Sequence, residues 1–222
     1  MKRFRDRKDA GARLAEKLAH YAGREDVLVL ALPRGGVPVA FQVVKVLGVP
    51  LDIFVVRKLG TPGHEELAMG AIATGGVRVL NDDIVRSLRV PEDAIDAAAE
   101  REGRELERRE RSYRGDRPAP ELRGRTVILV DDGLATGATM RAAAQAVKAQ
   151  GPAKVVVAVP TAAPETCAAL RAEVDEIICA ETPQPFSGVG MWYDDFAHTS
   201  DEEVRELLEA AKRVRHGPSL GE

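Results

Sequence analysis

The part of the sequence that most constrains the fold runs from Thr126 to Met140 and reads TVILVDDGLATGATM. Its first residues, Thr126–Val130, are β-branched or aliphatic, which is the pattern of a strand buried on both faces of a parallel sheet. Two carboxylates, Asp131 and Asp132, follow, and a glycine-rich turn leads into an alanine-rich segment that predicts a helix. The sequence therefore predicts a strand, an acidic pair, a turn and a helix in this order.

The turn after the acidic pair is suited to a phosphate monoester. A turn at a helix N-terminus presents backbone N–H groups on the positive end of the helix dipole. Asp131 and Asp132 can accept hydrogen bonds from two neighbouring sugar hydroxyls, so the turn and the pair together describe a ribose 5-phosphate site. The stretch has no Lys for a Walker-type loop and no Gly-x-Gly-x-x-Gly turn. Helix capping, the purely structural alternative, explains one of the two carboxylates.

The motif VILVDDGLATGATM resembles the phosphoribosyl pyrophosphate (PRPP) signature of the type I phosphoribosyltransferases. The resemblance implies an α/β fold with a Rossmann-like parallel sheet and helices on both faces, which agrees with the alternation of strands and helices along the chain. It also implies that Asp131 and Asp132 hold the ribose and are catalytic. The 5-phosphate would be bound by the loop residues Gly133, Ala135, Thr136, Gly137, Ala138 and Thr139.

A second strand, glycine turn and helix come earlier in the chain. Val27–Leu32 predicts a buried strand, and Pro33-Arg34-Gly35-Gly36 follows it before an apolar helix. A Gly-Gly turn lets the backbone approach a ligand closely, and Arg34 adds hydrogen-bond donors. In the family this turn is the pyrophosphate loop, so the resemblance assigns Arg34, Gly35 and Gly36 to pyrophosphate. The alternative is an ordinary structural turn.

Leu51–Val56 predicts a third strand, which ends in Arg57 and Lys58. The stretch VVRKLGTPGH is similar to the entry of the mobile loop in orotate phosphoribosyltransferases, and by that resemblance both cations would contact pyrophosphate. A solvated strand end is the alternative. Glycines and prolines in residues 59–76 favour a flexible loop that covers the site. Val77–Leu80 would then return antiparallel to Leu51–Val56 as an edge hairpin.

His64 lies in the predicted flexible loop and is a candidate proton carrier, because the pKa of histidine is near neutrality. A histidine in a glycine-rich loop is more often simply polar. Residues 91–117 form a long, highly charged helical insertion, in which Glu100 and Arg104, like Glu105 and Arg109, are spaced for ion pairs along a helix. The pattern indicates an exposed helix that could serve a dimer interface.

The chain divides into a core of residues 1–180 and a segment of residues 181–222, which holds a small hood and a last helix. The hood resembles that of purine phosphoribosyltransferases, and by that resemblance Phe186, Val189 and Trp192 would contact a base. Asp194 is a candidate metal ligand; otherwise Mg2+ would be held through PRPP. Alternatively, the aromatic rings only attach the tail to the core.

Composition limits the partners of the chain. A net charge of −3 and a pI near 5.9 argue against nucleic acid. No apolar run has membrane-spanning length and no signal peptide is evident, so no membrane partner and a cytoplasmic location are expected. Cys167 and Cys179 are interpreted as packing thiols. A homodimer is the commonest assembly for such a chain.

These features predict a pentosyltransferase that moves ribose 5-phosphate from PRPP to a nitrogenous, purine-like base in nucleotide metabolism, with Mg2+ and with release of pyrophosphate. A PRPP-binding regulator without catalysis would keep the same anchoring residues. A hydrolase or phosphorylase could use the same site on another donor. The sequence does not identify the acceptor base.

Overall fold

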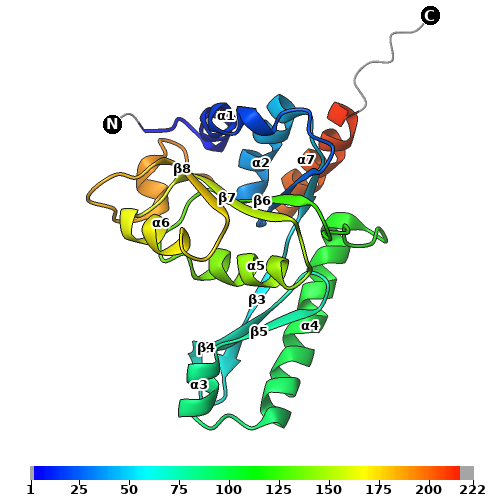
Figure 1. Cartoon of the computed structure of the whole chain (residues 1–222), viewed down its shortest axis with the longest axis vertical. Coiled ribbons are helices and arrows are strands. Elements are labelled where there is room, and N and C mark those ends of the chain that lie inside the picture. Colours follow the sequence, from blue (N-terminus) through cyan, green and yellow to red (C-terminus); the bar gives the residue numbers. More distant parts are fainter. Residues whose placement is uncertain (1–2, 216–222) are drawn as a thin grey trace, which may run out of the picture.

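The computed structural model describes residues 3–215. Residues 1–2 of the predicted core segment and residues 216–222 of the predicted C-terminal segment lie outside the described residues. A five-stranded sheet of order β2-β1-β6-β7-β8 forms the centre (Figure 1). Each neighbouring pair is parallel, as predicted. The strands are β1 (Val27–Ala31), β2 (Leu51–Ile53), β6 (Thr126–Val130), β7 (Lys154–Thr161) and β8 (Glu176–Glu181).

Helices cover both faces of the sheet (Figure 1). One face carries α1 (Arg7–Lys17), α2 (Gly36–Leu47) and α7 (Asp201–Arg215), and the other carries α5 (Ala138–Lys148) and α6 (Pro164–Leu170). Successive residues of the central strands enter different cores: Ile128 packs with the first group of helices and Leu129 with the second. This explains the unbroken apolar run of β6. No helix within residues 3–215 is both long and apolar enough to cross a membrane.

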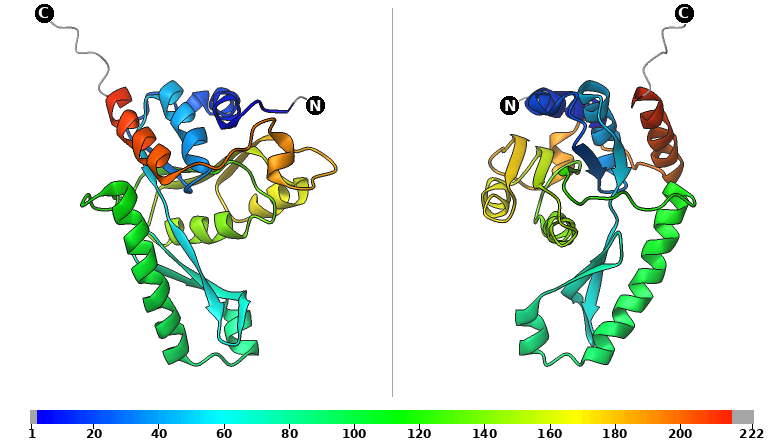
Figure 2. Two further views of the ribbon diagram at one scale, coloured as in Figure 1. Left: turned by 180° about the vertical axis from the view of Figure 1, so that it is seen from behind. Right: turned by 45° about the vertical axis from the view of Figure 1, so that its right-hand side comes forward.

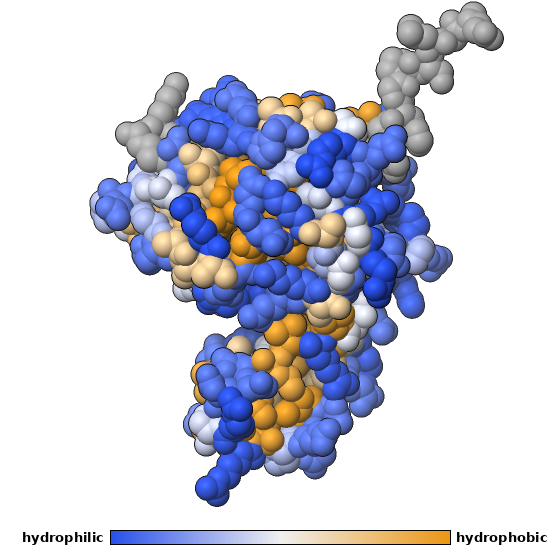
Figure 3. Space-filling model, in the orientation of Figure 1, coloured by the Kyte–Doolittle hydropathy of each residue, from blue (hydrophilic) through white to orange (hydrophobic). Residues whose placement is uncertain are grey.

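A second sheet projects from the core together with two helices (Figures 1 and 2). It contains β3 (Val56–Thr61), β4 (His64–Ala73) and β5 (Val77–Leu80) in an antiparallel meander. The helices α3 (Asp82–Ser87) and α4 (Glu92–Arg114) follow, and α4 packs on β3 and β4. We call residues 56–114 the arm. Its surface carries an apolar patch (Figure 3), and Leu67, Leu80 and Leu88 are exposed on it.

Three predictions about residues of the arm and the strand before it are wrong. The expected strand Leu51–Val56 is divided between β2 and β3, which belong to different sheets. Residues 59–76, expected as a loop, are mostly strand, and Val77–Leu80 pairs with β4 rather than with Leu51–Val56. Glycines that indicated a loop instead allow close strand approach: a Cβ on Gly60 would lie 2.8 Å from the Glu65 carbonyl oxygen.

The charged helix forms as predicted, with the Glu100–Arg104 and Glu105–Arg109 pairs at 2.6 and 3.1 Å. It is less exposed than the sequence indicated, because one side of α4 is buried in the core. The buried apolar residues are Ile95, Ala98, Ala99, Leu106 and Tyr113. The hydroxyl of Tyr113 also donates to Asp201 at 2.6 Å, which joins the end of the arm to α7.

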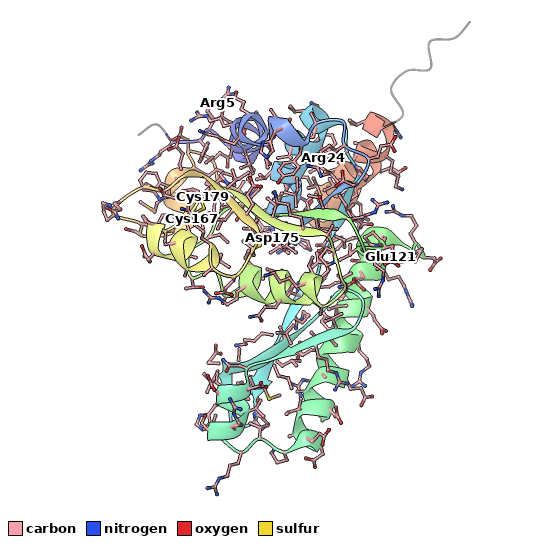
Figure 4. All side chains as sticks on the ribbon, viewed as in Figure 1. Arg5, Arg24, Glu121, Cys167, Asp175 and Cys179 are labelled. Carbon is pink, nitrogen blue, oxygen red and sulfur yellow. A yellow bond between two sulfur atoms is a disulfide. The ribbon has the colours of Figure 1, made fainter. Side chains whose placement is uncertain are left out.

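The two cysteines are not free thiols, contrary to the prediction. Cys167 of α6 and Cys179 of β8 form a disulfide (Figure 4). The two residues are 12 positions apart in the chain, and only the packing of α6 beside β8 brings them together. The bond therefore joins a helix and the edge strand of the core, shortly before the hood segment begins.

Candidate active site

The acidic pair stands at the carboxyl end of β6. Asp131 Oδ1 accepts a hydrogen bond from the Asp132 amide at 2.8 Å. The following loop reaches α5 through Gly137, whose φ of 72° is left-handed. The first helical hydrogen bond is donated by Arg141 to the Gly137 carbonyl at 2.8 Å, so the amides of residues 138–140 precede it. Of the loop residues predicted to bind phosphate, Ala135, Thr136, Ala138 and Thr139 are exposed, whereas Gly133 and Gly137 are buried.

The glycine turn after β1 meets the acidic pair, because β1 and β6 are neighbours in the parallel sheet. A Cβ on Gly35 would lie 2.7 Å from Asp132 Cγ, and one on Gly36 would lie 2.6 Å from the Val130 carbonyl oxygen. Only glycine allows this approach. Arg34 turns away toward the start of α7, where it contacts His198 and lies 3.7 Å from Asp201 Oδ1.

Arg57 and Lys58 point to opposite faces of β3, as successive residues of a strand do. Arg57 pairs with Glu102 of α4 at 2.7 Å. Lys58 faces a cavity of about 670 Å3 between the arm and α5, which reaches the phosphate loop through Ala138 and Thr139. The two cations therefore do not face one site together. His64 is exposed at the turn between β3 and β4.

The hood lies directly against the acidic motif. A Cβ on Gly133 would lie 2.6 Å from Val189 Cγ1, so Val189 packs on the start of the phosphate loop. The Tyr193 hydroxyl donates to the Asp132 carbonyl at 2.6 Å. The rings of Phe186 and Trp192 stack on each other with centroids 6.4 Å apart. These contacts place the hood over the end of β6.

The described residues offer few ligands for a metal ion. Asp194 is exposed, and its amide donates to the Phe4 carbonyl at 2.8 Å. Within residues 3–215, no group of three or more His, Cys, Asp and Glu side chains could hold a metal. A cation at the acidic pair would therefore need further ligands from a bound molecule.

The model of the phosphoribosyl transferase domain matches residues 2–195 of the sequence. This chain belongs to the phosphoribosyl transferase family. Two Mycobacterium tuberculosis proteins, Rv0571c of strain H37Rv and MT0597 of strain CDC 1551, carry that family name provisionally. Each is 50% identical over 213 residues, which are 96% of this chain and 48% of the relative. The chain thus spans about half the length of these curated relatives.

A solved structure shares the fold of this chain. The protein TT1426 from Thermus thermophilus is 46% identical, with a TM-score of 0.82, and the match covers 93% of this chain and 97% of that one. The match to the phosphoribosyl transferase model, together with the five-stranded parallel sheet and its helices, agrees with the type I phosphoribosyltransferase fold predicted from the motif.

One residue at this candidate site has no signal in the sequence. Arg7 of α1 places Nε and Nη2 each 2.9 Å from Asp132 Oδ2, and its side chain is only 12% exposed. Nη1 donates to the Ala197 carbonyl at 2.6 Å, and the guanidinium lies 4.0 Å from the centre of the Phe196 ring. Arg7 belongs to a charged N-terminal helix with no motif, so the sequence carried no signal for this contact.

Burial and charge shift the pKa values of three groups at the candidate site. Burial raises the pKa of Asp131 well above its usual range, and the neighbouring Asp132 charge raises it further. Burial also raises the pKa of Asp132, while the charge and hydrogen bonds of Arg7 oppose that rise. The pKa of Tyr193 is raised by its burial and by the charge of Asp132. The pair thus favours ligands that bring positive charge or hydrogen-bond donors.

Proposed function

We propose that this chain transfers ribose 5-phosphate from PRPP to a nitrogenous, purine-like base and releases pyrophosphate. One observation carries the proposal: the acidic pair stands between the N-terminus of α5 and the Gly35-Gly36 turn. A ligand with a phosphate, two neighbouring hydroxyls and a pyrophosphate, in that order, matches these three features. Membership of the phosphoribosyl transferase family supports PRPP as that ligand.

The proposed roles follow the geometry. Asp131 and Asp132 accept hydrogen bonds from the ribose hydroxyls, and the backbone of Gly133, Ala135, Thr136, Gly137, Ala138 and Thr139 binds the 5-phosphate. Pyrophosphate would be bound by Arg34, Gly35, Gly36, Arg57 and Lys58. Arg57 can take part only after leaving Glu102, since that ion pair now directs it toward α4. Arg34 would likewise have to leave His198 and Asp201 at the start of α7.

In the reaction, the bond between ribose C1 and the pyrophosphate oxygen breaks, and a bond from the base nitrogen to C1 forms. Positive charge develops on the ribose ring and negative charge on the leaving pyrophosphate. The acidic pair lies where it can stabilise the first charge, and the backbone at the Gly35-Gly36 turn lies where it can stabilise the second. Closing the site against water would limit hydrolysis of PRPP.

A magnesium ion fits this arrangement when it is held through PRPP. Two desolvated carboxylates favour a nearby cation, but the described residues lack a complete ligand set. Bound in this way, Mg2+ would supply a Lewis acid for the leaving pyrophosphate. Asp194 could assist only through a change in the hood, since its side chain is exposed on the surface.

Base recognition is assigned to the hood. Val189 already contacts the phosphate loop, and the paired rings of Phe186 and Trp192 offer an aromatic surface for a planar ligand. His64 would act as a proton carrier only if the arm moved, because it lies at the exposed turn of the β3–β4 hairpin.

Calorimetric titration with PRPP and Mg2+ tests the proposal. The Asp131→Asn, Asp132→Asn double variant should lose binding, whereas Glu92→Gln, Asp93→Asn, which changes an exposed acidic pair on the arm, should not. A screen of bases for pyrophosphate release then separates a transferase from a PRPP-binding regulator. Absence of PRPP binding at millimolar concentration in the unmodified protein would reject both functions.

Ribose 5-phosphate serves as the competitor in the same titration. A transferase that uses PRPP should lose most of its affinity without the pyrophosphate group, because the Gly35-Gly36 turn then binds nothing. Equal affinity for both compounds would instead favour a hydrolase or phosphorylase acting on a different ribose phosphate donor.

A further inference from the structure

Arg7 connects three parts of the site that are distant in the sequence. It belongs to α1, it pairs with Asp132 after β6, and it contacts Phe196 and Ala197 beyond the hood. It also borders the glycine turn, since a Cβ on Gly35 would lie 3.3 Å from Arg7 Nε. A side chain held by a carboxylate, a carbonyl and an aromatic ring has little rotational freedom.

The contacts of the acidic pair leave a defined face for a ligand. Asp132 Oδ2 accepts two N–H groups from Arg7, and Asp131 Oδ1 accepts the amide of Asp132. Within residues 3–215, the other oxygen of each carboxyl group makes no hydrogen bond or ion pair. Asp132 Oδ1 and Asp131 Oδ2 thus remain for two ribose hydroxyls.

We propose that Arg7 is a positioning residue for PRPP, which fixes the Asp132 carboxyl group so that Oδ1 faces the ribose. The inference rests on the proposed function. Two N–H groups on one oxygen restrain rotation of the carboxyl group, and the guanidinium charge reduces the repulsion from Asp131. The contacts with Phe196 and Ala197 then couple this orientation to the segment that follows the hood.

Arg13 provides a matched control on the same helix. It also pairs with an aspartate, Asp9, at 3.0 Å, and its guanidinium lies 5.0 Å from the centre of the Phe4 ring. Its side chain is 33% exposed, and its partners are not at the acidic pair. Replacing either arginine removes an ion pair and an aromatic contact from α1, but only Arg7 touches Asp132.

The experiment measures PRPP affinity with Mg2+ by calorimetry, together with thermal unfolding. We expect Arg7→Gln to weaken PRPP binding by about 10- to 100-fold, by analogy with the loss seen when a residue that orients a metal ligand is removed. Arg7→Lys keeps the charge but loses the paired N–H groups and the flat contact with Phe196, so it should weaken binding by several-fold. Arg13→Gln should bind as the unmodified protein does.

A double-mutant cycle distinguishes positioning from a general structural role. If Arg7 acts through Asp132, Arg7→Gln should weaken binding by less than about threefold once Asp132 is already Asn. Equal losses in both backgrounds would show that Arg7 acts on the fold or the hood, which would overturn the inference. The same conclusion follows if folded Arg7→Gln binds PRPP normally.

Two further outcomes, an unfolded Arg7→Gln variant and an unmodified protein that does not bind PRPP, also lead to a clear conclusion. If Arg7→Gln does not fold, Arg7→Lys decides, and unchanged PRPP affinity in that variant would contradict the positioning role. If the unmodified protein does not bind PRPP, the proposed function itself is wrong. Normal PRPP binding by the Arg7 variants would instead reject only the positioning role of Arg7.

Discussion

Gly35 lies so close to Asp132 that adding one methyl group, by a change to alanine, tests whether the glycine turn and the acidic pair form one site. Gly35 has a φ of −61°, which any residue can adopt, so a Gly35→Ala substitution causes no backbone strain. Its Cβ would instead lie 2.7 Å from Asp132 Cγ and displace the carboxyl group. We expect a loss of stability of about 1–3 kcal/mol and a loss of PRPP binding of at least about tenfold.

Gly103→Ala is the control for this prediction, measured by the same titration and thermal unfolding. Gly103 lies within α4, and its Cβ would meet only Ile72 Cδ1, at an ordinary 3.4 Å. Alanine there should be neutral or stabilise the helix by up to about 1 kcal/mol. Normal PRPP binding by Gly35→Ala would show that the turn and the acidic pair do not form one site.

The ionised Asp131 carboxyl group should lower the folding stability of the protein without ligand, although it favours the complex with PRPP. Its pKa is raised in the folded state, so the folded protein binds the proton more tightly than the unfolded chain, whose value is near 3.8. Stability attributable to this group therefore falls as the pH rises above about 3.8. Asp131→Asn should raise the melting temperature at pH 7, and by less at pH 4.5.

Melting curves of Asp131→Asn and of the unmodified protein at both pH values measure this difference. An equal gain at pH 4.5 and pH 7 would exclude ionisation as its cause. The same variant should bind PRPP more weakly, because an amide nitrogen cannot accept a hydrogen bond from a ribose hydroxyl. A gain in stability with a loss of binding is the expected signature of a functional carboxylate.

At the residue scale, the sequence indicated the candidate site residues that belong to a local motif. Asp131, Asp132 and the glycines beside them are adjacent in the chain, and their chemistry can be interpreted from their order. Arg7 lies 125 positions from Asp132, and one arginine in a charged helix looks like any other. Its role depends on the packing of α1 against the hood, which no local pattern encodes.

At the scale of elements, α4 is attached to the core by a buried arginine. Arg114 is 3% exposed, pairs with Asp52 of β2 at 3.0 Å and donates to the Ile53 carbonyl at 2.9 Å. Arg114→Ala would leave Asp52 without its buried partner, so we expect a loss of about 3–5 kcal/mol in the free energy of unfolding. Arg104→Ala removes an exposed pair on the same helix and should cost at most about 0.5 kcal/mol.

Denaturant unfolding of both α4 variants gives the comparison. Similar free energies of unfolding for Arg114→Ala and Arg104→Ala would mean that the buried ion pair does not anchor the arm. The measurement needs no ligand, and so it is independent of the proposed function.

The elements also show where sequence patterns mislead. The central strands β1 and β6 were predicted well because they are continuous apolar runs that end just before glycine-containing turns. The arm strands carry polar and glycine residues, since part of β4 is exposed on its outer half and Gly70 allows β5 to approach. The same composition indicates a loop when only the sequence is known.

At the scale of the whole molecule, the arm and the core should differ in stability and respond differently to PRPP. The first residues of β4 are exposed, whereas every residue of β6 is buried. Amide hydrogen exchange should therefore be much faster in residues 62–67, which are exposed, than in β6. There is room for the arm to close further, because a cavity of about 670 Å3 lies between it and α5. Among residues 3–215, Lys58 bonds only to Glu66, through the carbonyl oxygen at 3.3 Å and the exposed carboxylate at 3.7 Å.

If Lys58 moves to pyrophosphate, PRPP and Mg2+ should slow exchange both in the phosphate loop, residues 131–139, and in residues 62–67. Ribose 5-phosphate should protect the loop alone, because it lacks the group that would attract Lys58. Hydrogen exchange with mass spectrometry distinguishes the two patterns, and Lys58→Gln should abolish the protection of the arm while leaving that of the loop. Protection of the loop without the arm in the unmodified protein would mean that PRPP binds to the core only, and that the arm is not a lid.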